Sequence, residues 1–279
     1  MTQLRRIKTV KLRRLVSTVA CRRYDDVGWQ RQGALVSYLA QSDAQPIHFT
    51  REGAKSSREL FDLLRKSNTL AEVEIGRYDQ PESFDKVEIP LGTYMELLDA
   101  GKGQFGDKAV YLAQWPGLEA MPALKEKVTT PPWLQEALDV QQADLYRASF
   151  FVGPTSAITP LHHDPYDNLF ELKEACRALK HFTILPKRLS HLLRSSEQQK
   201  NTSSVDFDIS SGKLALSAAS PSQKYAQEIL NAAQTCVLAP GDTLLLPRGF
   251  WHRVETISTD SAQPGWAASI GFWFRMRAN

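Results

Sequence analysis

From about Asp144 onward, the chain is divided into short apolar segments by glycine and proline residues. Short segments of this kind, separated by turn residues, are typical of β-sandwiches and β-barrels. We therefore predict a mainly β protein with a barrel core at about residues 144–276. The segments are DLYRASFFVG, ITPLHHDP, HFTILP, CVLAP, DTLLLP, HRVETI and AASIGFWFRM. Residues 194–223 interrupt the series and are expected to form a long exposed loop, followed by a helix from Ser220 to about Ala233.

The preceding half of the chain mixes helices with strands. Ser56 and Glu59 form a capping-box pattern, which predicts a helix over SRELFDLLRK. Thr93 and Glu96 repeat the pattern at the start of a second short helix, which Gly101 is expected to end. A third helix is predicted over PPWLQEALD, and the alternating stretches AEVEIGRY and KAVYLAQW are predicted strands. We expect these elements to flank an antiparallel barrel.

The first 24 residues are basic, since they hold eight of the 34 Lys and Arg residues and none of the 31 Asp and Glu residues. The rest of the chain has 26 basic against 31 acidic residues, a net charge of −5, which gives no electrostatic reason for it to bind nucleic acid. A solvated arm, a mitochondrial targeting peptide and a nucleic-acid-binding arm all fit such a leader. We divide the chain into this arm, residues 1–24, and a single domain, residues 25–279.

The sequence also restricts the compartment. Nowhere do 18 apolar residues follow one another, so neither a transmembrane helix nor a membrane partner is expected. The three cysteines, Cys21, Cys176 and Cys236, are scattered and form no CxxC motif, which favours a reducing compartment over a disulfide framework. We predict an intracellular protein of the cytoplasm or nucleus, with the mitochondrion as the alternative because of the basic leader.

The stretch TPLHHDPYDN, residues 159–168, places two histidines and two aspartates between apolar segments. On a strand, residues two apart point to the same face, so His162 and Asp164 face one way and His163 the other. A third ligand is expected from His252, which follows the apolar strand and turn of PGDTLLLPRGF. Two histidines and one carboxylate on adjacent strands form a facial triad that suits non-haem Fe(II).

An HxD pattern alone is common by chance, and a histidine after a turn can be a plain strand residue. The combination of HxD on a strand, about 90 residues of chain and the segment that ends at His252 is what favours a metal centre. The other histidines, which lack such a context and are predicted to be structural or exposed, are His48, His181 and His191.

These segments resemble the JmjC family of Fe(II)- and 2-oxoglutarate-dependent oxygenases, and especially its compact JmjC-only hydroxylases. The similar text is TPLHHDPYDNLF, KHFTILP, APGDTLLLPRGFWHRV, SIGFWFR and, upstream, AVYLAQWPGLEAMPALKEKV, within roughly residues 70–276. The resemblance implies a double-stranded β-helix, a jelly-roll or cupin-like barrel, with flanking N-terminal helices and strands. It also implies a dioxygenase that uses Fe(II), 2-oxoglutarate and O2 to hydroxylate a C–H bond, in a protein side chain or, second, in a modified RNA base.

The resemblance also assigns roles to single residues. Lys180, which opens KHFTILP, would pair with the distal carboxylate of 2-oxoglutarate. The ligands of the iron would be His162, Asp164 and His252. The remaining polar side chains of the cosubstrate pocket would be Tyr111, Thr159 and Asn168.

One segment departs from the family pattern. Between Asn168 and Lys180 the text LFELKEACRALK is about three residues longer than in the family, lacks the usual glycine and is rich in helix formers. The family's spacing would place Arg177 at the cation position, but the apolar strand that follows Lys180 directly favours Lys180. A damaged pocket here would make the chain an inactive JmjC-like binding module, and another type of cupin metalloprotein is the third alternative.

Overall fold

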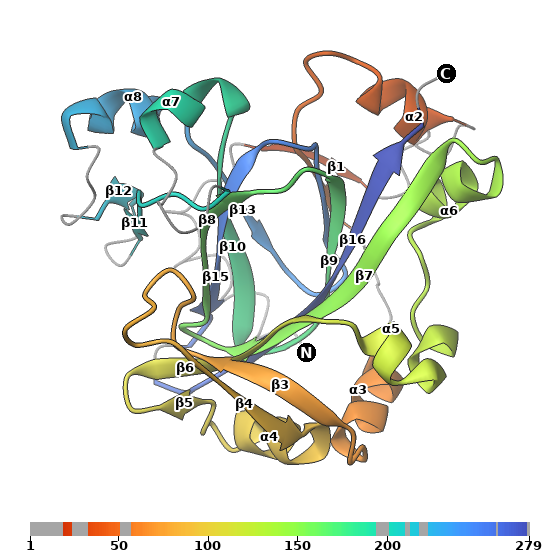
Figure 1. Cartoon of the computed structure of the whole chain (residues 1–279), viewed down its shortest axis with the longest axis vertical. Helices are drawn as coiled ribbons and strands as arrows, with labels where there is room; N and C mark the ends of the chain where they lie inside the picture. Colours follow the sequence, from red (N-terminus) through yellow and green to blue (C-terminus); the bar gives the residue numbers. More distant parts are fainter. Residues whose placement is uncertain are drawn as a thin grey trace.

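The computed structural model of the 279-residue chain describes residues 19–23, 33–50, 57–193, 201–209, 213–217, 223–260 and 262–277. This part of the chain is mostly β, with two facing sheets and helices around the larger one (Figure 1). None of its helices is long and apolar enough to cross a membrane.

The larger sheet has ten described strands, in the order β1-β2-β14-β9-β16-β7-β6-β3-β4, with β5 paired to β6. Its β1–β2 pair is parallel, and the other pairs of described strands are antiparallel. The strands are β1 (Ala20–Arg23), β2 (Ile47–Thr50), β3 (Leu70–Ile75), β4 (Asp85–Pro90), β5 (Gln104–Phe105), β6 (Lys108–Trp115), β7 (Ala143–Pro154), β9 (Asp167–Cys176), β14 (Thr243–Leu246) and β16 (Trp266–Met276).

The smaller sheet is antiparallel, in the order β13-β10-β15-β8, and β11 and β12 form a separate pair. These strands are β8 (Ile158–His163), β10 (Ala178–Leu185), β11 (Phe207–Asp208), β12 (Ala215–Leu216), β13 (Gln234–Leu238) and β15 (Trp251–Ser258). The described α-helices are α2 (Ala34–Leu39), α3 (Arg58–Arg65), α4 (Leu91–Asp99), α5 (Gly117–Ala120), α6 (Pro132–Asp139), α7 (Ser190–Leu193) and α8 (Ala226–Ala232).

Each face of the larger sheet buries its own apolar cluster. One cluster joins the sheet to the N-terminal helices, as where Phe61 of α3 contacts Trp266 of β16. The other lies between the two sheets, where Phe170 of β9 meets Phe182 of β10 edge to face. Burying a Phe side chain stabilises a fold by about 1.5–3 kcal/mol, so these faces hold the sheets together and surround a shared interior.

The structure confirms the mainly β fold with flanking N-terminal helices and strands. The predicted strand KAVYLAQW is β6, and the predicted helices around residues 58–65 and 132–139 are α3 and α6. The predicted start of α4 was wrong, because the helix begins at Leu91, two residues before Thr93. Its first amide donates to the backbone oxygen of Thr69, so a side-chain cap is not needed there.

Two further expectations need correction. The segment between Asn168 and Lys180, rich in helix formers, is strand β9, because β14 and β16 pair with it on both sides and override local propensity. Part of the predicted exposed loop is buried: Thr202 is 1% exposed and Phe207 3%. Residues 194–200, 210–212 and 218–222 of that loop, including the predicted helix start at Ser220, lie outside the described residues.

The basic arm lies largely outside the described residues, which begin at Val19. Within the arm, Ala20–Arg23 form β1, which pairs with β2 at the edge of the larger sheet. Val19 is 4% exposed and belongs to the cluster between the sheets. The last residues of the arm therefore pack against the domain.

Candidate metal centre

The predicted metal ligands lie together on two neighbouring strands. His162 of β8 is directly opposite His252 of β15, and their ring centroids are 4.1 Å apart. Asp164 follows the end of β8, with carboxylate oxygens 4.0 Å from Nε2 of His162 and 3.7 Å from Nε2 of His252. One ligand atom from each of the three residues lies within 4.8 Å of the others. The structure thus brings all three side chains to one point.

Backbone carbonyls orient both imidazole rings. Nδ1 of His162 is 2.8 Å from the carbonyl oxygen of Pro160, and Nδ1 of His252 is 3.2 Å from that of Phe250. Because a carbonyl only accepts, each Nδ1 carries the proton and donates it, which leaves the lone pair of each Nε2 free. Both rings therefore offer Nε2 to a metal ion.

Asp164 is also fixed by hydrogen bonds. The indole Nε1–H of Trp273 donates to Oδ2 of Asp164 at 2.8 Å. The backbone oxygen of Asp164 accepts the N–H of Gly249 at 3.0 Å; Gly249 lies in the turn before β15, and its φ of 81° suits glycine. These two bonds connect Asp164 to β16 and to the strand that carries His252.

Burial and charge favour the metal-binding forms of these side chains. Burial lowers the pKa of His252 to about 3, so its ring is neutral at physiological pH. Burial also opposes ionisation of Asp164, but its neighbours His252 and His162 and the bond from Trp273 hold the pKa of its carboxyl below the usual value. Two imidazole nitrogens and one carboxylate are ligands that fit a divalent ion such as Fe(II).

Thr159 lies on the same wall of the cavity as His162, although an odd spacing normally puts strand residues on opposite faces. The register explains this. His252 pairs with His162 and Val254 with Thr159, so β8 contains one residue more than β15 between these pairs. The extra residue forms a bulge at Pro160, which has no N–H for the ladder, and the bulge turns Thr159 inward.

A buried lysine lies at the other end of this region. Lys180 of β10 is 1% exposed, and its Nζ donates to Oγ1 of Thr256 at 2.8 Å and to the hydroxyl of Tyr111 at 3.3 Å. That hydroxyl is also bonded to Thr159. None of the described carboxylates forms an ion pair with this ammonium group, and burial lowers its pKa to about 7. A buried cation with neutral partners alone is costly, so the position favours an anionic ligand.

A cavity lined by both sheets extends from His162 and His252 to Tyr111, whose hydroxyl contacts Lys180. Asn168 of β9 is 4% exposed, and its Oδ1 has no hydrogen-bond partner among the described residues. Gln114 also lines the cavity, with a φ of 50° at an irregularity of β6. The lining residues are Tyr111, Gln114, Phe151, Thr159, His162, Asn168, Phe170, Phe182, His252, Val254 and Trp273.

Sequence reasoning missed Thr256 and Trp273. Thr256 pairs across the ladder with Lys180 and follows His252 by four residues, an even spacing that places both on one face of β15. That spacing was readable in the sequence. No local pattern marks Trp273, because its contact with Asp164 joins residues 109 positions apart.

The remaining predicted positions lie elsewhere. Arg177, the alternative cation, is exposed in the β9–β10 turn with a φ of 52°, and its Nε donates to the carbonyl of Pro264. His163 points away from the centre, as predicted, and its ring packs edge-on against Trp251 at 4.6 Å. The other histidines have no place in the centre. His48 lies 3.1 Å from Asp242, His181 is buried in β10, and His191 is exposed on α7.

The outer edge of β8 is covered by the segment 201–209. The N–H of His163 donates to the oxygen of Asn201 at 3.0 Å, and the N–H of Ser203 donates to the oxygen of Leu161 at 2.7 Å. His162 and Thr202 form a bridge between these bonds. The strand that carries two histidines therefore has partners on both edges, which limits its movement.

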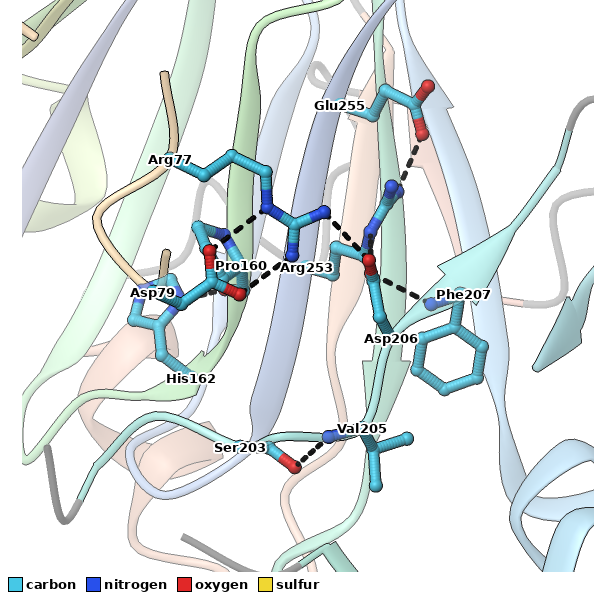
Figure 2. A network of polar contacts seen from close by, with 10 residues as sticks. All are labelled: Arg77, Asp79, Pro160, His162, Ser203, Val205, Asp206, Phe207, Arg253 and Glu255. Atoms are coloured by element: carbon cyan, nitrogen blue, oxygen red, sulfur yellow. Dashed lines mark hydrogen bonds and ion pairs between the residues drawn. The ribbon is translucent and has the colours of Figure 1, made fainter. Parts of the chain in front are cut away.

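A network of charges fastens this segment (Figure 2). Asp206 accepts Nη1 of Arg77 at 2.7 Å and Nε of Arg253 at 2.9 Å. Arg77 also donates to both oxygens of Asp79, at 3.0 and 2.7 Å, and Arg253 donates to Glu255 at 2.6 Å. Since Arg253 is adjacent to His252, the network joins the cover of β8 to the strand that holds the third ligand.

Comparison with known proteins places this architecture in a family. The cupin-like domain profile matches residues 18–279. The chain belongs to the cupin-like, JmjC-type family. The match begins well before residue 70, the approximate start of the sequence resemblance, and it includes β1 and β2.

Curated relatives of this cupin-like chain are named as JmjC domain-containing proteins or lysine-specific demethylases. It is 27% identical to JmjC domain-containing protein F of Dictyostelium discoideum, over 60% of the chain and 36% of the relative. It is 26% identical to lysine-specific demethylase 8 of Xenopus tropicalis, over 59% and 32% respectively. It is 22% identical to lysine-specific demethylase JMJ30 of Arabidopsis thaliana, over 76% and 44%. The chain thus spans less than half the length of these relatives.

Proposed function

We propose that this cupin-like chain is an Fe(II)- and 2-oxoglutarate-dependent dioxygenase that uses O2 to hydroxylate a C–H bond of a protein side chain. The observation that carries the proposal is the pairing, in one buried region, of a His-Asp-His group with an ammonium group that lacks a carboxylate partner among the described residues. Two of the relatives are named lysine-specific demethylases, which supports a protein substrate.

Iron and 2-oxoglutarate together would supply the oxidising power that protein side chains lack. In this proposal His162, Asp164 and His252 hold the ion and leave its remaining positions for the cosubstrate and O2. Trp273 keeps the carboxylate of Asp164 oriented through its indole N–H. Each ring presents Nε2 without a rearrangement, because its Nδ1 is already bonded to a carbonyl.

The other polar side chains orient the cosubstrate. Lys180 pairs with the distal carboxylate, and the hydroxyls of Tyr111 and Thr256, which already contact its Nζ, complete that end. Asn168 offers its unpaired amide oxygen, Oδ1, from the facing sheet. The apolar side chains that line the cavity keep water away, which strengthens each charge interaction. They are Phe151, Phe170, Phe182 and Val254.

The pairing of β9 with β14 and β16 in the larger sheet, and of β10 with β13 and β15 in the smaller one, supports an active site over an inactive binding module. The sequence between Asn168 and Lys180 departs from the family pattern, which would be compatible with a damaged pocket. These residues form an antiparallel strand in the larger sheet, followed by a tight turn at Arg177, and Lys180 then lies in the protein interior. The departure from the family pattern is therefore compatible with a lysine in the protein interior.

The proposal is tested by the conversion of 2-oxoglutarate to succinate with Fe(II) and O2 and without added substrate. Titration of 2-oxoglutarate into the Mn(II)-loaded protein measures binding independently of slow turnover. We expect binding and iron-dependent succinate. Protein of demonstrated iron content that binds no 2-oxoglutarate would overturn the proposal, and metal chemistry that ignores 2-oxoglutarate would indicate another cupin metalloprotein.

We propose the cytoplasm or nucleus as the compartment, in keeping with the scattered cysteines. The names of the relatives give no support to a mitochondrial location. Most of the basic leader, residues 1–18, lies outside the described residues. A modified RNA base stays the second substrate class, and the tests below separate it from a protein substrate.

A further inference from the structure

Four exposed or half-buried side chains form a stack beside the metal centre. The rings of Tyr146 and Tyr166 are parallel to within 10°, with centroids 4.2 Å apart. The guanidinium of Arg275 lies 4.5 Å from the ring of Tyr166, and that of Arg147 lies 5.8 Å from the ring of Tyr146. One face of Tyr166 is covered by Tyr146, so Arg275 must cover the other. We call this group the tyrosine–arginine column.

The fold places the column next to the proposed chemistry. Tyr166 lies in the β8–β9 turn, two residues after Asp164. Arg147 pairs across the ladder with Trp273, whose indole contacts Asp164, so the two side chains share a face of the sheet. Arg275 follows Trp273 by two residues and points to that same face.

A bulge in β7 supplies the fourth member. Trp273 pairs with Arg147 and Phe274 with Leu145, so Tyr146 is an extra residue on β7. A bulge re-aims the side chain of its extra residue, and here Tyr146 meets Tyr166 from the neighbouring turn. Tyr146 is nevertheless 58% exposed, a large exposure for an aromatic side chain in a strand.

Both arginines are exposed, and no described carboxylate pairs with either. Asp144, which lies opposite Arg275 on β7, is bound instead by Arg277 through two hydrogen bonds. The tyrosine rings restrict the planar guanidinium groups, so less side-chain entropy is lost when an anion binds. The edges of both groups keep their N–H donors available.

We propose that the tyrosine–arginine column is a recognition subsite for acidic residues, Asp or Glu, near the modified residue of a protein substrate. This inference rests on the proposed function and adds a substrate class to it. A planar guanidinium binds a carboxylate through two parallel hydrogen bonds, and the column offers two of them beside the metal centre. Single-stranded nucleic acid is disfavoured, because Tyr146 and Arg275 occupy both faces of Tyr166 and residues 25–279 carry a net charge of −5.

The probe is a fluorescent 12-residue peptide containing four Glu residues, measured by anisotropy at low salt against a Gln-for-Glu version and a 12-nucleotide oligouridine. We expect binding of the Glu peptide only. The double variant Arg147→Gln/Arg275→Gln should weaken that binding at least tenfold, and Arg275→Lys should weaken it partly, because lysine keeps the charge but not the planar fork.

The matched control is Arg277→Gln, which removes an exposed arginine of the same strand end whose charge is already paired with Asp144. It should leave peptide binding within about twofold, whereas equal losses for Arg277→Gln and Arg275→Gln would mean general charge attraction and overturn the proposal. No binding of the Glu peptide, or tighter oligouridine binding that needs the same arginines, would overturn it too. Succinate formation by the unaltered protein reports the proposed oxygenase function separately, so failure of one idea is distinguishable from failure of the other.

Discussion

The two polar ends of the cavity are built on opposite charges. At one end, the imidazoles of His162 and His252 and the carboxylate of Asp164 converge, and the Nδ1 of each ring is bonded, so the unmatched groups are electron donors. At the other end, the ammonium of Lys180 is buried among the hydroxyls of Tyr111 and Thr256, so the unmatched group is a cation. A positive ion and an anion are the ligands that would satisfy them.

The two ends together restrict the possible ligands more than either end alone. A His-Asp-His group by itself is compatible with many cupin metal sites, and a buried lysine by itself is compatible with a structural role. A ligand with a metal-chelating end and a distant carboxylate satisfies both ends at once, and 2-oxoglutarate has that form. The charges therefore support a cosubstrate that extends along the cavity.

Two groups of arginines show a similar contrast. Asp79 and Asp206 surround Arg77 and raise its pKa although burial works against the charge, and Arg253 is matched by Asp206 and Glu255 (Figure 2). These arginines fasten segments of the chain. The arginines of the tyrosine–arginine column have aromatic partners but no described carboxylate, which is why we infer a ligand for them.

The largest effect is expected from Asp164→Ala, which removes the carboxylate of the metal end. Loss of an outer-shell partner already costs about 10–100-fold in metal affinity, so loss of a ligand should cost more than about 100-fold and abolish succinate formation. Calorimetry with Mn(II) measures the binding. His163→Ala, which alters the neighbouring histidine that faces Trp251, is the control. Wild-type Mn(II) affinity in Asp164→Ala would refute the ligand assignment.

Lys180→Ala acts on the other end alone. Removing one member of a buried charge pair costs about 3–5 kcal/mol, so the concentration of 2-oxoglutarate needed for half-saturation should rise about 100-fold or more. Mn(II) affinity should stay near the wild-type value. Arg177→Ala tests the alternative alignment and should change neither quantity. If Arg177→Ala weakens 2-oxoglutarate binding and Lys180→Ala does not, the cation has been assigned to the wrong residue.

The pH dependence of binding tests the charge of Lys180 directly. Its pKa of about 7 in the free protein means that the ammonium form disappears as the pH rises through about 7. Since a carboxylate needs that form, the affinity for 2-oxoglutarate should be level below pH 7 and weaken by up to about tenfold per pH unit above it. Titrations between pH 6 and 9 measure this, and Lys180→Arg should flatten the profile because arginine keeps its charge.

The stability of the free protein should respond to pH in the opposite direction. The ordinary lysine pKa of 10.5 applies to the unfolded chain, so between about pH 7 and 10.5 the unfolded state binds one more proton than the folded state. The contribution of Lys180 to stability therefore rises with pH over that range and is lowest below pH 7. Urea unfolding of the wild type and Lys180→Met at each pH would reveal the difference, and parallel curves would contradict the lowered pKa.

The smallest effect is expected from Thr256→Val, which keeps the shape of the side chain and removes one hydrogen bond to Lys180 Nζ. A typical hydrogen bond contributes about 1 kcal/mol net, so 2-oxoglutarate affinity should fall roughly fivefold. Mn(II) binding should not change. Thr183→Val, at a buried threonine of β10 whose Oγ1 has no partner among the described residues, is the matched control. Equal changes in both variants would show that Thr256 has no specific role.

Much of the protein could be predicted from local sequence. Glycine and proline between apolar segments predicted the strands, because turns and buried strands depend on neighbouring residues. The even spacing of His162 and Asp164, and the turn before His252, predicted three convergent side chains for the same reason. The resemblance to JmjC proteins predicted a role for Lys180, which lies on β10 and is buried in the protein interior.

Other features depended on contacts between distant segments. The segment between Asn168 and Lys180 forms a strand despite its helix-forming residues, because β14 and β16 pair with its backbone on both sides. Thr159 faces the cavity through a bulge that is defined only by pairing with β15. The sequence by itself determined which residues are available for chemistry, since residue type and strand period are local properties. The tertiary structure alone decided that Trp273 holds Asp164 and that Tyr146 meets Tyr166, because register and bulges arise only when strands pair.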